Sequence, residues 1–467
     1  MSRLARIVAP ALARARIVAP ALARARIVAP ALALLAVPFV PAQAATEVEV
    51  VTSPGGIVAW LVEEPSIPMV AMEISFKGGA SREPDERVGV THFLSTMLDE
   101  GAGELDSAAF SARADQLAMR YGFEAGRDSF TVSARMLSET REDSVELLRS
   151  ALVEPRFDPE PLERMRASIL STLRDQATDP QAILARTWRE RLFGDDPYAR
   201  PMEGTPESVA AITADDLRAA RERALNRSRL AIGVVGDITA EELGPLLDRL
   251  LGDLPADPWD PLGPAELSSD RDLTVIPFDI PQSSAAFVQE GLARDDPDFI
   301  PAYVMNHILG GGGFSSRLTE EVREKRGLTY GVYSYLAPYD RAALMAGGVA
   351  SSNDRVAEAI EVIRGEWARM REAGVTEEEL DEAKRYLTGA YPLRFDSNAK
   401  IAGQLAGLME EGFTPVYLEE RNALIDAVTV DDIARVAQRL LHPEALMVTV
   451  IGEPEGLPEA ERAAPAD

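Results

Sequence analysis

The chain has 467 residues, of which 46% are hydrophobic and 27% charged, which excludes a disordered or fibrous protein and predicts more than one folded domain. It contains no cysteine, which excludes disulfides and thiolate metal sites. The 48 basic and 76 acidic residues give a net charge of -28, which argues against binding to nucleic acid or to anionic lipid.

The N-terminus is predicted to be a secretory signal peptide, residues 1–44. A ten-residue unit rich in Arg, Ala and Pro repeats from residue 6, and six arginines precede an apolar run that ends near the small residues Ala42 and Ala44. A retained membrane anchor is the alternative, although the run is short and interrupted by proline. Removing the six arginines leaves 42 basic and 76 acidic residues, or -34. We expect a periplasmic or secreted protein.

Two β-strands and five helices are expected in the first half of the mature chain. The strands are residues 57–62 and 69–76, separated by a turn with two prolines. The helices are residues 88–98, 107–121, 141–154, 161–176 and 180–193. Strands followed by a run of helices are typical of an α+β domain.

The helix at residues 88–98 carries an incomplete zinc motif. The pattern H-x-x-E-H places two imidazoles on one helical face, with a carboxylate between them that takes a proton from metal-bound water. His92 occupies the first position, whereas Ser95 replaces the Glu and Thr96 replaces the second His. A neutral hydroxyl is a poor base and a poor zinc ligand. We therefore expect His92 to be a helix residue that is hydrogen-bonded in the core.

A long internal repeat divides the mature chain into two similar domains. Each copy has a Thr cap before Asp-Asp at a helix start, and a β-branched run that predicts a buried strand at 230–235 or 446–451. Three identical pairs share one ungapped offset of 216: Asp215 with Asp431, Arg223 with Arg439, and Gly236 with Gly452. We predict two homologous α+β domains, each a mixed, mostly antiparallel sheet with helices on one face: residues 45–251 and 273–467, with a proline-rich linker at 252–272.

The second half contains four consecutive glycines followed by a phenylalanine. Gly310, Gly311, Gly312 and Gly313 precede Phe314, which predicts a loop of wide backbone freedom such as a flexible lip or hinge over a cleft. A phosphate-binding loop is a weaker alternative, because no Lys-Ser/Thr pair follows.

These features resemble the pitrilysin/insulinase (inverzincin) family of zinc peptidases, which includes mitochondrial processing peptidase and the core subunits of the cytochrome bc complex. The resemblance covers residues 46–455. It rests on residues 89–98, 192–198 leading to 204–205, 311–318 and 323–330.

The resemblance also implies which zinc ligands are missing. The family's third ligand, a Glu on a later helix, would fall where this chain has Ser171 and Thr172. Base, second His and acidic ligand are all replaced, so we expect no metal in this chain.

A second family site is present. Arg323 and Tyr330 stand seven residues apart, the separation at which the family projects an Arg and a Tyr toward the substrate. They suit the binding of a peptide carbonyl and its oxyanion. Alternatively, Arg323 forms an ordinary salt bridge with Glu320 or Glu324, and Tyr330 is a half-buried strand residue.

The predicted function is therefore that of a zinc-free subunit in a heterodimeric periplasmic metallopeptidase. A homologous partner would carry H-x-x-E-H and zinc, and Arg323 and Tyr330 would act in the partner's site. Residues 310–314 would contact the substrate, which would be a peptide or an unfolded segment, and the acidic surface would favour basic ones. The alternative is a non-catalytic assembly or peptide-binding protein of the same fold. A lone enzyme with another metal set is disfavoured, because the first mature half has one His.

Overall fold

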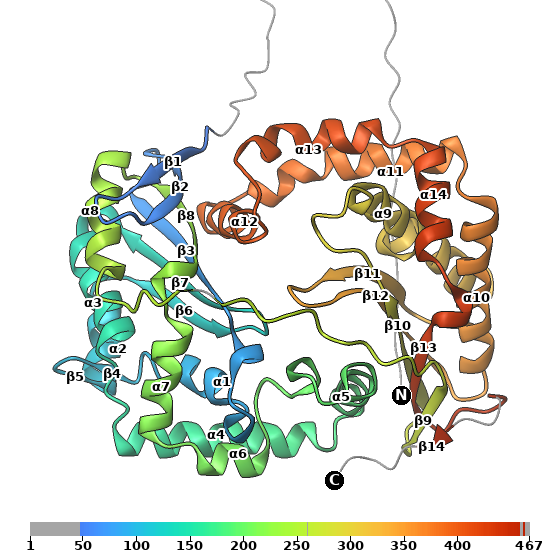
Figure 1. The fold of residues 1–467 in the computed structure, drawn as a ribbon, viewed down its shortest axis with the longest axis horizontal. Coiled ribbons are helices and arrows are strands. Elements are labelled where there is room, and N and C mark those ends of the chain that lie inside the picture. Colours follow the sequence, from blue (N-terminus) through green and yellow to red (C-terminus); the bar gives the residue numbers. More distant parts are fainter. Residues whose placement is uncertain (1–46, 259, 458–460, 463–467) are drawn as a thin grey trace, which may run out of the picture. The chain divides into compact units, whose positions relative to one another are not determined.

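The computed structural model describes residues 47–258, 260–457 and 461–462; the expected signal peptide lies outside the described residues. Two six-stranded sheets form its framework (Figure 1). None of the helices in the described ranges is long and apolar enough to cross a lipid bilayer.

The first sheet has the strand order β1-β2-β8-β3-β7-β6. Its strands are β1 (Glu49–Thr52), β2 (Val58–Glu63), β3 (Met69–Lys77), β6 (Arg120–Ala125), β7 (Ser129–Leu137) and β8 (Leu230–Gly236). A short hairpin, β4 (Gly101–Ala102) and β5 (Leu105–Asp106), stands apart from it.

The second sheet has the order β11-β12-β10-β13-β9-β14. Its strands are β9 (Leu273–Pro277), β10 (Gln282–Glu290), β11 (Val332–Pro338), β12 (Ala343–Ser352), β13 (Met447–Gly452) and β14 (Glu461–Arg462). The segment between the first half and β9, expected to be a linker, has no helix or strand in its described residues.

Five strands of each sheet share one topology. The order β2-β8-β3-β7-β6 corresponds to β9-β13-β10-β12-β11. In both, the first pair is parallel and the other three pairs are antiparallel. The predicted duplication and the predicted mixed, mostly antiparallel sheets are confirmed.

Each half contributes a set of helices, most of which cover the outer face of its own sheet (Figure 1). In the first half they are α1 (Val90–Ser95), α2 (Ser107–Gln116), α3 (Arg141–Val153), α4 (Pro159–Gln176), α5 (Pro180–Phe193), α6 (Pro206–Ala211), α7 (Ala214–Ala224) and α8 (Ala240–Leu251). In the second half they are α9 (Phe299–Asn306), α10 (Val356–Ala373), α11 (Glu377–Gly389), α12 (Asn398–Glu410), α13 (Val416–Ala427) and α14 (Val430–Leu440). The expected caps are present: Thr213 and Thr429 each form a reciprocal capping box with an Asp three residues later.

Two helices leave their own half and cover the inner face of the other sheet. Helix α12 packs on β8 and β3 of the first sheet, and α5 packs on β13 and β10 of the second (Figure 1). Alternate strand residues such as Trp60 and Val235 form a second apolar face, which closes on Leu405 of α12. On the other sheet, Trp188 of α5 packs in a cluster with Val288. Each half therefore completes the core of the other.

A buried polar cluster joins the halves beside α5. Tyr198 is completely buried and donates a hydrogen bond to Asp128 at 2.5 Å. The Arg341 guanidinium binds both carboxylate oxygens of Asp196 at 2.9 and 2.7 Å, and its backbone N–H donates to the Tyr198 hydroxyl. Paired and hydrogen-bonded in this way, these groups tolerate burial. The segment 192–198, part of the family resemblance, thus has a structural role.

The expected helix at 107–121 is wrong in its second part. Helix α2 ends at Gln116, and residues Arg120–Ala125 form β6, which pairs with β7. Between them Ala118 adopts a left-handed backbone with φ of 51°, which interrupts the helix. The expected helix at 88–98 is likewise shorter, since α1 spans only Val90–Ser95. The sequence pattern also missed the hairpins β6–β7 and β11–β12.

The exchange of helices predicts a stability effect at Gly233. A Cβ added there would lie 2.1 Å from the Ala402 carbonyl oxygen and 2.9 Å from the Ala406 nitrogen, so α12 would have to move. We expect Gly233→Ala to lower the free energy of unfolding by about 2–3 kcal/mol, measured by urea denaturation.

Gly403, in α12 itself, provides a matched control. A Cβ there meets nothing within 4 Å. Gly403→Ala should leave stability unchanged or raise it by up to about 1 kcal/mol, because Ala favours the helix. Equal losses in the two variants would contradict the close packing of α12 on β8.

Candidate functional site

The hydroxyls at the two degenerate motif positions bond to the backbone of helix α1. The Ser95 hydroxyl donates to the His92 carbonyl oxygen at 2.7 Å, and the Thr96 hydroxyl donates to the Phe93 carbonyl oxygen at 2.8 Å. His92 is half-buried, and burial lowers its pKa, so the ring is neutral near pH 7. Its ring accepts or donates no hydrogen bond among the described residues, which corrects the expectation of a hydrogen-bonded core histidine.

Helix α4 presents a guanidinium to α1. Ser171 and Thr172 are exposed, and Thr172 donates to the Ser168 carbonyl oxygen of its own helix. Arg166 lies 5.4 Å from the centre of the Phe93 ring and donates to the carbonyl oxygen of Ile212. The positions expected for the acidic ligand thus carry hydroxyls, and the charged group that α4 places against α1 is a guanidinium.

The residues present do not fit zinc. A catalytic zinc site takes three protein ligands, and α1 offers one imidazole beside two hydroxyls that are already bonded. Nor do three or more His, Asp or Glu side chains gather in a metal-binding arrangement anywhere in the part of the chain that the structure describes.

The glycines at 310–312 serve close packing, which corrects the expectation of free backbone there. Helix α9 continues into a π-helical turn (His307–Gly311), and Gly310 is buried. A Cβ at Gly310 would lie 2.3 Å from the Ser334 hydroxyl, and one at Gly312 would lie 2.7 Å from the His307 carbonyl oxygen. Only Gly313, with φ of 58° and nothing within 4 Å, has the predicted freedom.

Arg323 and Tyr330 are both presented at the surface. Arg323 ends a second π-helical turn (Thr319–Glu324), and its guanidinium lies 4.7 Å from the centre of the Phe314 ring, which is 76% exposed. Its ion pair with Glu324, 3.3 Å long, is solvent-accessible and contributes little. Tyr330 is 86% exposed and lies before β11, so the half-buried alternative is wrong.

The backbone on either side of Tyr330 is held firmly. The buried Thr329 hydroxyl donates to the Ala350 carbonyl oxygen at 2.6 Å and accepts a hydrogen bond from the Gly331 N–H at 3.0 Å. The phenol ring thus projects into solvent from a fixed base.

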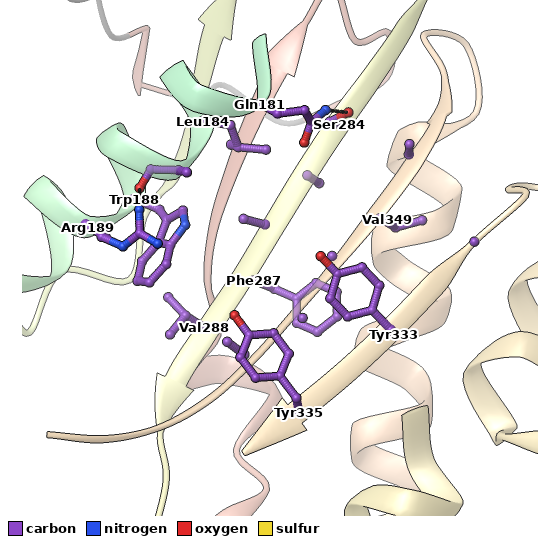
Figure 2. A pocket seen from close by; sticks show the side chains of 18 residues that line it. Gln181, Leu184, Trp188, Arg189, Ser284, Phe287, Val288, Tyr333, Tyr335 and Val349 are labelled. Atoms are coloured by element: carbon purple, nitrogen blue, oxygen red, sulfur yellow. Dashed lines mark hydrogen bonds between the residues drawn. The ribbon is translucent and has the colours of Figure 1, made fainter. Parts of the chain in front are cut away.

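A further site, absent from the sequence-based expectations, is a cavity of about 440 Å³ between α5 and strands β10, β11 and β12 (Figure 2). Trp188 and Arg189 line it from the helix, and Tyr333 and Tyr335 line it from the edge strand β11. One sequence signal could have indicated this site. Tyr333 and Tyr335 alternate with Ser334, a pattern that predicts a strand with aromatic side chains on one face.

The corresponding corner of the first half is acidic. Glu73 on β3 is half-buried, and burial together with the nearby Glu124 on β6 raises its pKa to about 7. Its carboxyl is thus partly protonated at neutral pH.

Each half of the chain matches a known protein family model. Residues 58–206 match the family described as insulinase (peptidase family M16), and residues 211–387 match the peptidase M16 inactive domain. The chain is 26% identical over 341 residues to the non-peptidase homolog YmxG of Helicobacter pylori, covering 73% of this chain and 78% of that protein. It is 24% identical over 432 residues to the mitochondrial-processing peptidase subunit beta of Lentinula edodes, covering 89% and 92%.

Solved structures give the same result. A peptidase M16 inactive domain from Pseudomonas fluorescens superposes with a TM-score of 0.82 at 28% identity, covering 90% of this chain and 99% of that one. A protease from Helicobacter pylori has the same fold, with a TM-score of 0.78 at 16% identity over 87% and 99% of the chains.

The raised pKa of Glu73 predicts a pH dependence of stability. Because the folded-state pKa of about 7 exceeds the usual 4.5, the folded state binds more protons in this window, and stability is lost as pH rises through it. Glu73→Gln should therefore raise the free energy of unfolding at pH 8 by on the order of 1 kcal/mol, after discounting for partial solvation, and leave it unchanged near pH 4. Denaturation curves at the two pH values test this; an equal gain at both would contradict it.

The donor set of α1 predicts the metal content. After dialysis against excess zinc and then buffer, elemental analysis of the purified chain should find far less than stoichiometric zinc. One zinc per chain that survives dialysis would contradict the fit described above.

Proposed function

Because the chain belongs to the insulinase (M16) peptidase family, we propose that it is the zinc-free subunit of a heterodimeric periplasmic metallopeptidase. One observation carries the proposal. The general base and two of the zinc ligands expected on α1 and α4 are replaced, whereas Arg323 and Tyr330 are present and lie at the surface. A subunit with no partner has no evident need for an 86% exposed tyrosine on a fixed backbone.

The chemistry of the pair suits a role in a partner's site. Arg323 is permanently charged and Tyr330 is a neutral hydroxyl donor, so together they can bind a peptide carbonyl and the oxyanion that develops on it. Zinc, held by H-x-x-E-H in the partner, would supply the activated water. This chain's contribution would be to orient the peptide and stabilise charge.

The contact between Arg323 and Phe314 supports a substrate-binding role for residues 310–314. The exposed Phe314 ring lies under the guanidinium at 4.7 Å, which fixes the direction of the arginine and offers an apolar surface to a peptide. The net charge of -28 favours basic peptides or unfolded segments over the surface as a whole and disfavours nucleic acid.

The second candidate is a non-catalytic assembly or peptide-binding protein of the same fold. The similarity to a relative named non-peptidase homolog favours it. The two candidates differ in one respect: only the catalytic subunit requires the functional groups of Arg323 and Tyr330.

The test mixes the mature chain with an H-x-x-E-H homologue from the same genome and measures hydrolysis of a peptide panel. We expect the mixture to exceed the homologue alone. Arg323→Ala should lower kcat/KM by about 10²-fold, and Tyr330→Phe by about tenfold, because each removes one oxyanion donor.

Two control variants lie away from the site. Arg218 on α7 is exposed and pairs only within its own helix, and Tyr303 on α9 is half-buried, so Arg218→Ala and Tyr303→Phe should retain full activity. If the mixture is no more active than the homologue alone, or if both site variants match their controls, the catalytic role is excluded and the assembly role is favoured.

A further inference from the structure

The cavity beside α5 has a floor of small residues. On the inner face of the second sheet, cross-strand pairs place Gly348 opposite Ala286, and Ala350 opposite Ser284. Trp188 forms one wall, and Tyr333 and Tyr335 form the other (Figure 2). The depth of the cavity results from this contrast in side-chain size, and its volume is in the range of small-ligand sites.

The two tyrosines are held in place without being buried. Their rings lie 6.1 Å apart and nearly parallel, and they are 56% and 40% exposed. The Tyr333 hydroxyl lies only 3.1 Å from the position that a Cβ at Gly348 would take. The absence of a side chain at Gly348 therefore leaves room for the tyrosine ring. Exposed aromatic faces in a concave site are typical of ligand contact.

The fold does not require these residues, as the first half demonstrates. Strand register makes β6, β7 and β3 the counterparts of β11, β12 and β10. At the positions of Tyr333, Tyr335 and Gly348, the first sheet has Gly122, Glu124 and Ser133, which pair through the same ladder. The same architecture thus exists with a polar corner, so the aromatic corner is a feature of the second half alone.

The charge of the cavity is opposite to that of the chain. Among the described residues that line it, Arg189 alone is charged, although acidic residues outnumber basic ones by 76 to 48 in the chain. The guanidinium donates to the Ala185 carbonyl oxygen at 3.2 Å and lies 4.9 Å from the centre of the Trp188 ring. Within the described ranges no carboxylate pairs with it.

Neutral donors complete the lining. Partial burial raises the pKa of Tyr335, and the charge of Arg189 opposes that shift, so the phenol stays protonated at neutral pH and lies within electrostatic reach of the guanidinium. The Gln181 amide donates to the Ser284 hydroxyl at 2.8 Å at the far end of the cavity.

We propose that this cavity binds an aromatic residue that carries a carboxylate, with the ring between Trp188 and the tyrosine pair and the carboxylate on Arg189. An unpaired guanidinium binds a carboxylate with charge-assisted hydrogen bonds, and flat π faces accept a ring. The carboxylate can be the C-terminus of a peptide that ends in an aromatic residue, or an acidic side chain next to an aromatic one. That the ligand is a peptide rests on the proposed function.

The experiment uses the mature chain alone, so that it does not depend on a partner or on hydrolysis. Isothermal titration measures binding of acetyl-Ala-Ala-Phe with a free carboxyl terminus, of its C-terminal amide, and of acetyl-Ala-Phe-Asp-Ala-amide. We expect at least one carboxylate peptide to bind roughly tenfold more tightly than the uncharged amide. The stronger of the two identifies the source of the carboxylate.

Variants locate the site. Arg189→Gln should lower the affinity for the carboxylate peptide by roughly tenfold and leave the affinity for the amide unchanged. Arg385→Gln is the matched control, since Arg385 also bonds only the carbonyl oxygen four residues earlier in its helix. Gly348→Val should abolish binding by filling the floor, and Tyr335→Ala gives a second test if the valine variant unfolds, as judged by circular dichroism.

Several results would overturn the inference: no binding of either carboxylate peptide at millimolar concentration, equal affinity for acid and amide, or equal effects of Arg189→Gln and Arg385→Gln. Binding in this assay without activity in the partner mixture would separate the cavity from the catalytic role. Activity in the mixture without binding here would retain the catalytic role and reject the cavity.

Discussion

Each sheet of this protein has two apolar faces, and its own half of the chain covers only one of them. The inner face is closed by a helix of the other half, α12 on β8 and β3, and α5 on β13 and β10. Without these helices, the inner faces of both sheets would expose large apolar areas to water, at a cost of about 25 cal/mol for each Å². The position of the cavity follows from this exchange, because α5 decides which part of the inner face of the second sheet remains open.

The open parts of the two inner faces have opposite chemistry. In the second half, Trp188, Tyr333 and Tyr335 surround a cavity with one cation. In the first half, Glu73 and Glu124 occupy the matching corner, close enough for the charge of one to raise the pKa of the other. The zinc motif has changed in a similarly local way. Ser95 and Thr96 satisfy their hydroxyls on carbonyl oxygens of α1, so the helix accommodates residues that do not bind metal.

Much of this could be predicted from sequence where the signal is local or repeated. The 216-residue offset predicted two like domains, and Thr213 and Thr429 predicted two capped helices. The repeat even matched Arg223 with Arg439, and each arginine lies near an acid that precedes the first helix of its half, Glu83 or Asp296.

What could not be predicted depends on contacts between distant segments. The glycines at 310–312 were interpreted as mobile because glycine is permissive, but which atoms approach them is decided by Ser334 and His307 in the folded chain. The cavity joins residues about 150 positions apart in sequence, and no local pattern reports such a meeting. The start of β6 was missed because Tyr121 fits the apolar pattern of the preceding helix, expected at 107–121, whereas pairing with β7 makes it a strand residue.

The strand order that five strands of each sheet share has a consequence for the origin of the chain. A half-length ancestor with this topology would have had an inner face that it could not cover, and would have covered it only by trading a helix with a second copy of itself. Duplication then joined two molecules that already fitted together. The present chain is in that sense a fused symmetric dimer. Its halves could then diverge in chemistry while the packing between them stayed the same.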